Sequence, residues 1–141
     1  MDYLERLPHA PPMRLLEEVL EVVPGSSCRA RRVAHPDDFY FQGHFPGNPV
    51  VPACIYIELM AQAGGLAVAS SVAADASATI ELRVAGVGRC KFPAAARPHA
   101  LLDITVRLGG TFGDLYRIEG EVKADGVLVA AGDVMLAGRR D

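Results

Sequence analysis

The feature that most constrains the fold is an apolar stretch near the middle of the chain. Residues 53–74, "ACIYIELMAQAGGLAVASSVAA", are long enough for about six helical turns and carry apolar or small side chains on nearly every side. Pro52 comes just before them and suits the first turn of a helix, where its missing N–H costs nothing. A helix that is apolar all round must be enclosed by other protein or by lipid. The sequence therefore predicts one long buried helix that begins near Pro52.

The same region, from Val50 to Ala69, is long enough to be mistaken for a membrane span. It carries Glu58 and Gln62 in its interior and the pair Gly64–Gly65 near its end. A lone glutamate in the hydrocarbon core of a bilayer costs several kcal/mol. We therefore expect the central helix of a soluble protein, with no part in a membrane.

Length and composition are those of one globular domain, so we expect residues 1–141 to fold as a single unit. A net charge of −3 argues against nucleic acid as the partner. The three cysteines lie far apart and form no CxxC pair, which argues against a disulfide framework and against a zinc site. The N-terminal "MDYLERLPHAPP" lacks the apolar core of a signal peptide. Together these features predict a cytoplasmic protein without a metal ion.

The second half of the chain has the pattern of antiparallel strands. In residues 99–110, every second side chain from Leu102 to Leu108 is apolar, the period of a strand with one buried face. Asp125–Gly126 is a strong hairpin signal. The predicted strands cover residues 79–92, 99–110, 114–124 and 127–137.

The first segment leaves two readings open. Residues 13–23, "MRLLEEVLEVV", fit a helix, but their β-branched end and the following "PGSS" turn also suit a strand. Residues 27–34 alternate loosely and are predicted as a strand, whereas residues 35–49 hold too much proline and glycine for either regular state. With two strands ahead of the helix and about four after it, the order fits an α+β hot-dog fold, one long central helix wrapped by an antiparallel sheet.

Glu58 is the anomaly within the apolar helix. It shares a helix face with Gln62, four residues on. Burial raises the pKa of a carboxyl group, so Glu58 is a candidate acid near neutrality. His44 lies fourteen residues earlier in the proline- and glycine-rich loop. The amides of Ala53 and Cys54, free in the first helical turn, would stabilise an oxyanion. This combination predicts proton abstraction next to a carbonyl group with loss of a β substituent.

Each of these residues also has a purely structural reading. A single glutamate in an apolar helix can pair with an arginine or reach the rim of the fold, and a histidine in a loop is commonplace. The two together, rather than either alone, favour a catalytic site.

The segment "GHFPGNPVVPACIYIELMAQAGG" resembles the signature of the FabZ/FabA family, the 3-hydroxyacyl-acyl-carrier-protein dehydratases of fatty-acid synthesis. "LPHAPPM" at 7–13 is similar to the N-terminal lead of that family, and the order of elements matches over nearly the whole chain. His44 and Glu58 keep the family spacing of fourteen, and a glutamate in place of aspartate makes the FabZ branch the more similar. Ala53 stands where the family usually has glycine.

The resemblance implies a role for each matching residue. His44 would remove the C2 proton of a (3R)-3-hydroxyacyl thioester, and Glu58 would protonate the departing hydroxyl group. Amides at the start of the helix would hold the thioester oxygen, and no cofactor is implied. The expected substrate-binding residues are Ala53, Cys54, Gln62, Phe45 and Gly47.

The resemblance also implies partners. The substrate would arrive on acyl carrier protein, in fatty-acid or related polyketide-like biosynthesis. The site would be built at a homodimer interface, and dimers of this family often associate into hexamers as a trimer of dimers. Two other functions stay open at this point: an enoyl-coenzyme A hydratase that uses the same two residues, and a non-catalytic hot-dog subunit that binds acyl chains.

Overall fold

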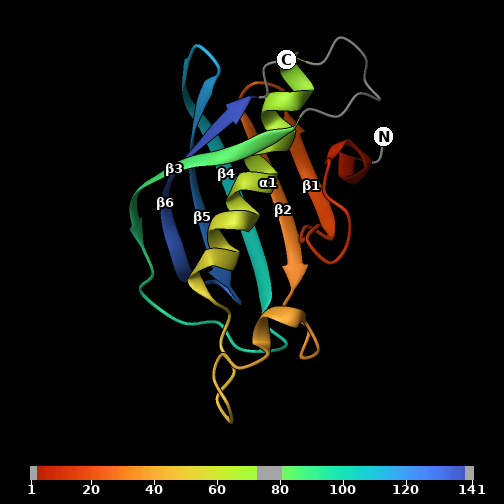
Figure 1. Ribbon diagram of the computed structural model, residues 1–141, viewed down its shortest axis with the longest axis vertical. Coiled ribbons are helices and arrows are strands. Elements are labelled where there is room, and N and C mark those ends of the chain that lie inside the picture. The colour runs from red at the N-terminus through yellow and green to blue at the C-terminus, as the bar shows by residue number, and fades with distance from the viewer. Residues whose placement is uncertain (1–2, 73–80, 139–141) are drawn as a thin grey trace.

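The computed structural model describes residues 3–72 and 81–138 and contains one long helix and one six-stranded sheet (Figure 1). The long helix, α1, runs from Ala53 to Val72 and follows two short 3-10 turns, η1 and η2. The elements in chain order are η1 (Tyr3–Arg6), β1 (Glu18–Val23), β2 (Ser27–Val33), η2 (Phe39–Phe41), α1, β3 (Leu82–Lys91), β4 (Leu101–Phe112), β5 (Leu115–Ala124) and β6 (Val127–Gly138).

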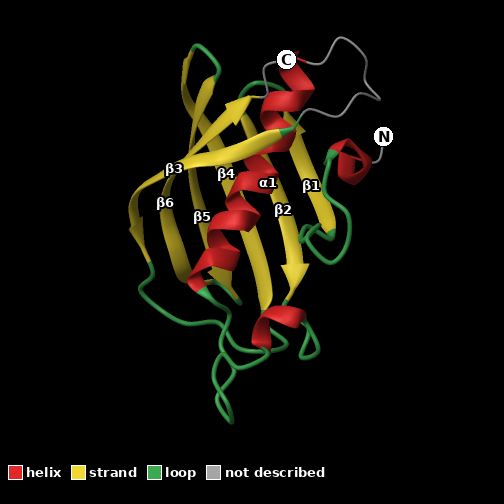
Figure 2. Cartoon of the chain, viewed as in Figure 1, coloured by secondary structure: helices red, strands yellow, loops and turns green. Residues whose placement is uncertain are grey.

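All neighbouring strands are antiparallel, in the order β1-β2-β4-β5-β6-β3. The sheet curls around α1, and β3 crosses the helix on the side away from β4 and β5 (Figure 2). This arrangement confirms the predicted α+β hot-dog fold. Residues 18–23 are a strand, which settles the two readings of the first segment. Residues 79 and 80 of the strand predicted over residues 79–92 lie outside the described residues.

The core forms between the sheet-facing side of α1 and the concave face of the sheet. Leu59, Met60 and Leu66 of the helix are fully buried, as are Ile104 of β4 and Ile118 of β5. Their burial explains why the helix is apolar on this side.

The helix is not enclosed on every side, however. Ala53 and Cys54 in its first turn are exposed, and Glu58 is half-buried. By length and composition Ala53–Ser71 is apolar enough to cross a membrane, but 67% of it is buried inside the fold, as in the core helix of a soluble protein. The expectation of a completely surrounded helix therefore holds for the sheet side and not for the first turn.

Gly64 is the point at which α1 presses closest on the sheet. A Cβ atom built there would lie 2.7 Å from Cγ1 and 2.9 Å from Cγ2 of Ile118 on β5. Both atoms belong to the stiff branched part of the side chain, which cannot swing away. The helix and the sheet can approach this closely only because residue 64 has no side chain.

Gly64→Ala is expected to lower the free energy of unfolding by about 1–3 kcal/mol, because overpacking outweighs the better helix propensity of alanine. Gly65→Ala is the matched control: its Cβ would meet only Leu82 Cδ1, at 3.9 Å. That variant should be neutral or gain up to about 1 kcal/mol. Urea unfolding of both variants checks the prediction. Equal stabilisation by the two substitutions would contradict the close approach.

Candidate active site

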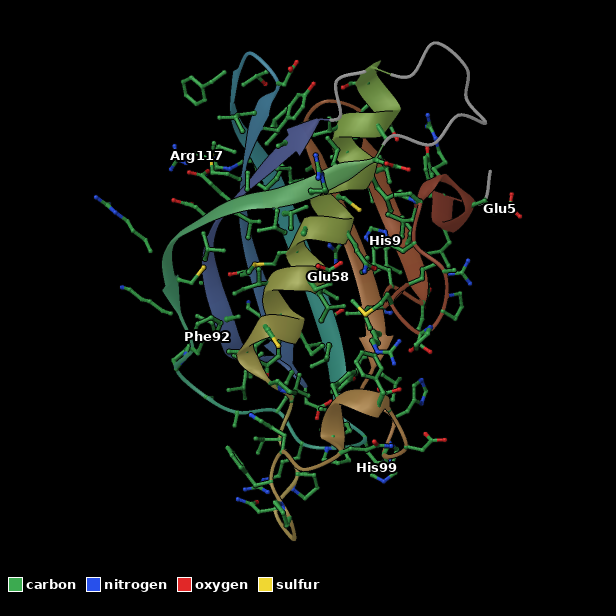
Figure 3. The ribbon with its side chains drawn as sticks, in the orientation of Figure 1. Glu5, His9, Glu58, Phe92, His99 and Arg117 are labelled. Carbon is green, nitrogen blue, oxygen red and sulfur yellow. The ribbon has the colours of Figure 1, made fainter. Side chains whose placement is uncertain are left out.

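Glu58 lies on the side of α1 next to His9, which belongs to the segment between η1 and β1, and its side chain is 24% exposed (Figure 3). Its Oε1 atom accepts a hydrogen bond from Nε2 of Gln62, at 3.1 Å, and lies 3.3 Å from Nε2 of His9 (Figure 3). Its Oε2 atom has no hydrogen-bond partner among residues 3–72 and 81–138. One carboxylate oxygen is therefore held by the protein, and the other is left for a ligand.

The pKa of Glu58 differs from the sequence expectation. Burial raises it, but the hydrogen bonds from His9 and Gln62, together with the charge interaction with His9, outweigh burial. The net result is a pKa below the usual value for glutamate. In the single chain, Glu58 is thus an ionised carboxylate near neutral pH, and not the protonated acid that its apolar neighbours suggested.

Gln62 is 1% exposed, and protein groups occupy all its hydrogen-bonding positions. Its Oε1 accepts from the amides of Leu15 and Leu16, at 2.9 and 3.4 Å. Its Nε2 donates to the carbonyl of Met13, at 2.7 Å, and to Glu58. Because an amide has two donors and two acceptor lone pairs, nothing remains for a substrate. In this chain Gln62 holds Glu58 and the segment before β1 in place.

His44 lies in a tight loop between η2 and α1 that projects beyond the start of the helix (Figure 1). The amides and carbonyls of Phe45 and Asn48 bond reciprocally, and the amide of Val50 donates to the carbonyl of His44, at 2.9 Å. Nδ1 of His44 lies 3.0 Å from the carbonyl oxygen of Val50. Since a carbonyl only accepts, Nδ1 carries a hydrogen, and in the neutral imidazole Nε2 then keeps the lone pair. The loop therefore presents His44 as a base.

Phe45 and Gly47, two predicted substrate-binding residues, belong to this loop. The ring of Phe45 stacks on the imidazole of His44, with centroids 4.2 Å apart, and is 54% exposed. Gly47 has a φ of +74°, which side chains rarely adopt. Phe45 thus buttresses the imidazole, and Gly47 permits the turn.

A buried ion pair anchors the segment that leads to this loop. Nη2 of Arg32 on β2 lies 2.6 Å from Oδ1 of Asp38, and both side chains are nearly buried, at 10% and 12% exposure. Oδ2 of Asp38 accepts from the hydroxyl of Tyr40, at 2.6 Å, while Nη1 of Arg32 donates to the carbonyl of Leu15, at 2.9 Å. Burial raises the pKa of Asp38, but bonds from Tyr40 and Arg32 outweigh it and leave that pKa low.

The first turn of α1 supplies free amide groups, as expected. The amides of Ala53 and Cys54 donate to no acceptor among the described residues, and both residues are exposed. They lie at the positive end of the helix dipole, so they suit a developing negative charge.

Within one chain, His44 and Glu58 do not meet. No hydrogen bond, ion pair or ring contact joins them in the described part of the chain. The loop of His44 extends past the N-terminal end of α1, and Glu58 lies farther along the helix (Figures 1 and 3). The single chain thus holds His44 and Glu58 as two separate candidate half-sites.

His9 is the residue at this site that the sequence analysis did not select. Its imidazole touches Glu58 although 49 residues separate the two in the chain. No periodic pattern marks it, and its only signal was membership of "LPHAPPM". Across residues 3–72 and 81–138, no three His, Cys, Asp or Glu side chains cluster as a metal site would require.

A long helix wrapped by a curled antiparallel sheet, with a histidine loop before the helix and a carboxylate on it, defines a hot-dog protein. The sequence model of the FabA-like domain matches residues 7–133. The chain belongs to this FabA-like family.

Sequence relatives agree with this assignment, and solved structures share the fold. The chain is 30% identical to the 3-hydroxyacyl-(acyl-carrier-protein) dehydratase FabZ of Dechloromonas aromatica, over 99% of this chain and 96% of the relative. It is 35% identical to FabZ of Shewanella woodyi, over 94% and 87%. The dehydratase heterocomplex ApeI:P of Xenorhabdus doucetiae superposes with a TM-score of 0.79 at 22% identity, covering 98% of this chain and 91% of that one. A thioesterase superfamily member of Thermus thermophilus gives 0.67 at 18% identity, covering 84% and 85%.

Proposed function

We propose that the protein is a 3-hydroxyacyl-acyl-carrier-protein dehydratase, a hydro-lyase that forms trans-2-enoyl thioesters. The observation that carries the proposal is the state of its two catalytic candidates. His44 has its Nε2 lone pair free, and Glu58 has one carboxylate oxygen held and the other free. The FabZ relatives named above bear the same activity in their names.

The proposed reaction needs one base, one acid and one oxyanion site. Nε2 of His44 takes the C2 proton of the thioester, and the electron pair forms the double bond between C2 and C3. The C3–O bond breaks, and Oε2 of Glu58 gives its proton to the departing hydroxyl group, which leaves as water. The amides of Ala53 and Cys54 stabilise the negative charge on the thioester oxygen.

Glu58 must be protonated for this role, although its pKa is low in the single chain. Burial is the largest influence on that pKa and acts upwards. Because a quarter of the side chain is still exposed, covering it with a partner protomer and an acyl chain would remove more water. Further loss of water favours the neutral carboxylic acid.

We also propose a homodimer in which His44 of one protomer faces the partner subunit's Glu58. Two observations support it: the half-sites are separate in one chain, and β3 is an edge strand with exposed apolar residues. Val84 and Val87 are 40% and 49% exposed. An exposed apolar edge strand is a template for pairing with another chain. A trimer of such dimers remains a prediction.

Acyl carrier protein is the proposed substrate carrier, and Arg97 supports this choice. Its guanidinium donates to Oδ1 of Asn48 in the loop of His44. No carboxylate pairs with Arg97 among the described residues, so its positive charge stays available at the site. An acidic carrier and its phosphate-bearing arm both suit such a group.

The test compares the same 3-hydroxyacyl group on acyl carrier protein and on coenzyme A. We expect a higher kcat/KM on the carrier, and a preference that fades with added salt because exposed charges are screened. Arg97→Glu should reduce that preference, because kcat/KM should fall more for the carrier substrate than for the coenzyme A substrate.

A preference for coenzyme A would favour the hydratase alternative instead. Absence of turnover on both substrates would favour the acyl-binding subunit.

We also propose that the protein is soluble and cytoplasmic. Two observations support this location: the apolar helix is mostly buried in the fold, and all three cysteines are free thiols, as in a reducing compartment.

A further inference from the structure

His9 reaches Glu58 from a segment that is well fixed. Figure 3 shows its side chain beside α1, next to Glu58, on the chain between η1 and β1. On one side of His9, Arg6 is 6% exposed and donates to the carbonyl of Ala69 and the hydroxyl of Ser70. On the other side, Gln62 bonds the backbone of residues 13, 15 and 16. Both flanks of His9 are therefore tied to the helix.

The chemistry of the contact determines which nitrogen faces Glu58. A carboxylate only accepts hydrogen bonds, so Nε2 of His9 carries a hydrogen and donates to Oε1. Nδ1 is buried without a protein partner in the described part of the chain. His9 borders a small cavity of about 10 Å³ that is also lined by Leu7, Ala61 and Gly65. The imidazole is held there with a single protein partner, Glu58.

Two donors therefore converge on one oxygen of Glu58. Gln62 and His9 both donate to Oε1, and Oε2 receives nothing from the described residues. The terminal torsion of a glutamate side chain is soft, so an unheld carboxyl group would exchange its two oxygens freely. With Oε1 held, only Oε2 is presented outwards.

We propose that His9 is a positioning residue for the dehydration reaction: with Gln62 it holds Oε1 of Glu58, so that Oε2 is the atom that gives the proton to the departing hydroxyl group. The expected effect of His9 on kcat rests on the proposed function. The contact itself does not depend on that function, and the two are tested separately.

The kinetic test compares His9→Leu, His9→Asn and His9→Gln in the assay with carrier-bound 3-hydroxyacyl substrate. Glutamine places an N–H the same number of bonds from Cα as Nε2 of histidine, whereas asparagine is one bond too short and leucine has no donor. We expect kcat to fall about 10- to 100-fold for Leu and Asn through misplacement of Glu58, with KM within about twofold. The glutamine variant should recover most of kcat.

The matched control is His35, whose Nε2 lies 2.7 Å from Oε2 of Glu17 in an exposed pair of the same kind. His35→Leu and His35→Gln should keep wild-type kcat. Asparagine and glutamine are both polar, so a general loss of folding should lower kcat equally in His9→Asn and His9→Gln. A difference in kcat between these two variants therefore indicates positioning. Wild-type kcat in His9→Leu or His9→Asn, or equal loss in His9→Asn and His9→Gln, would overturn the proposal.

A second measurement does not require activity. Carbon-13 NMR of labelled glutamate carboxyl groups, with Glu58 assigned by its absence in Glu58→Gln, follows the titration of Glu58 directly. Besides His9, the charged residue that lines the cavity beside Glu58 in the described part of the chain is Arg6 of η1, and β3 contributes the apolar Leu82 there. We expect the pKa of Glu58 to rise in His9→Leu, and to rise less in His9→Gln, which keeps the hydrogen bond but loses the charge interaction. If the wild type shows no dehydration but the titration of Glu58 shifts in His9→Leu, the proposed function fails and the contact between His9 and Glu58 stands. If the titration of Glu58 does not shift in His9→Leu, the contact is overturned.

Discussion

His44→Ala and Glu58→Gln, purified separately, are each expected to lose about 100- to 10,000-fold in kcat, because each removes a proton-transfer group. Both variants should keep the fold and the oligomeric state of the wild type. Among the described residues, the side chain of His44 makes one hydrogen bond, to a loop carbonyl, and the carboxamide of Glu58→Gln fills the same volume as the carboxylate. Activity with carrier-bound 3-hydroxyacyl substrate, circular dichroism and size-exclusion chromatography measure the three quantities.

Mixing the two inactive variants is the sharper experiment. If His44 of one protomer serves the partner subunit's Glu58, a mixed dimer holds one intact site and one doubly defective site. Random exchange after mild unfolding and refolding should then restore about a quarter of wild-type activity, since half the dimers are mixed and each has one working site. If both residues of a site came from one chain, mixing would restore nothing. His35→Ala and Glu121→Gln are the controls, because they make the same kinds of substitution at partly exposed side chains, 42% and 43% exposed.

Arg32→Met is expected to have the largest effect on stability. The substitution leaves Asp38 buried with an uncompensated charge and removes the donor to the carbonyl of Leu15. We expect a loss of about 3–5 kcal/mol in the free energy of unfolding, as for other broken buried pairs. Activity should fall as well, because Asp38 fixes the segment that leads to the loop of His44.

Arg31→Met is a control on the same strand. Arg31 pairs with Asp103 at 2.8 Å, but the side chains are 38% and 33% exposed, so the loss in the free energy of unfolding should be below about 1 kcal/mol.

The pH dependence of the free energy of unfolding gives an independent check. The pKa of Asp38 is lowered in the folded state, so its stabilisation is complete above the ordinary carboxyl pKa and is lost as the pH falls through the folded pKa. The gap between wild type and Arg32→Met should therefore narrow in acid, and a constant gap would argue against the buried pair as its cause.

Much of the fold could be predicted because its signals are local. The start of α1 follows from Pro52, and the alternation in 99–110 and the Asp125–Gly126 turn predict β4 and the hairpin between β5 and β6. Residues 13–23 could not be settled in this way. Their side chains suit either state, and only pairing with β2 makes residues 18–23 a strand.

The sequence alone was sufficient to identify a long apolar helix and a hot-dog order of elements, and it selected His44 and Glu58 as the catalytic candidates, which stays a prediction. Only the tertiary structure revealed that Glu58 is ionised in the single chain, that Gln62 is fully occupied, and that His9 holds the carboxylate. The physical reason is the separation along the chain. A hydrogen bond between residues 46 to 49 positions apart produces no periodic pattern in the sequence. The pKa of a buried acid depends on such long-range contacts.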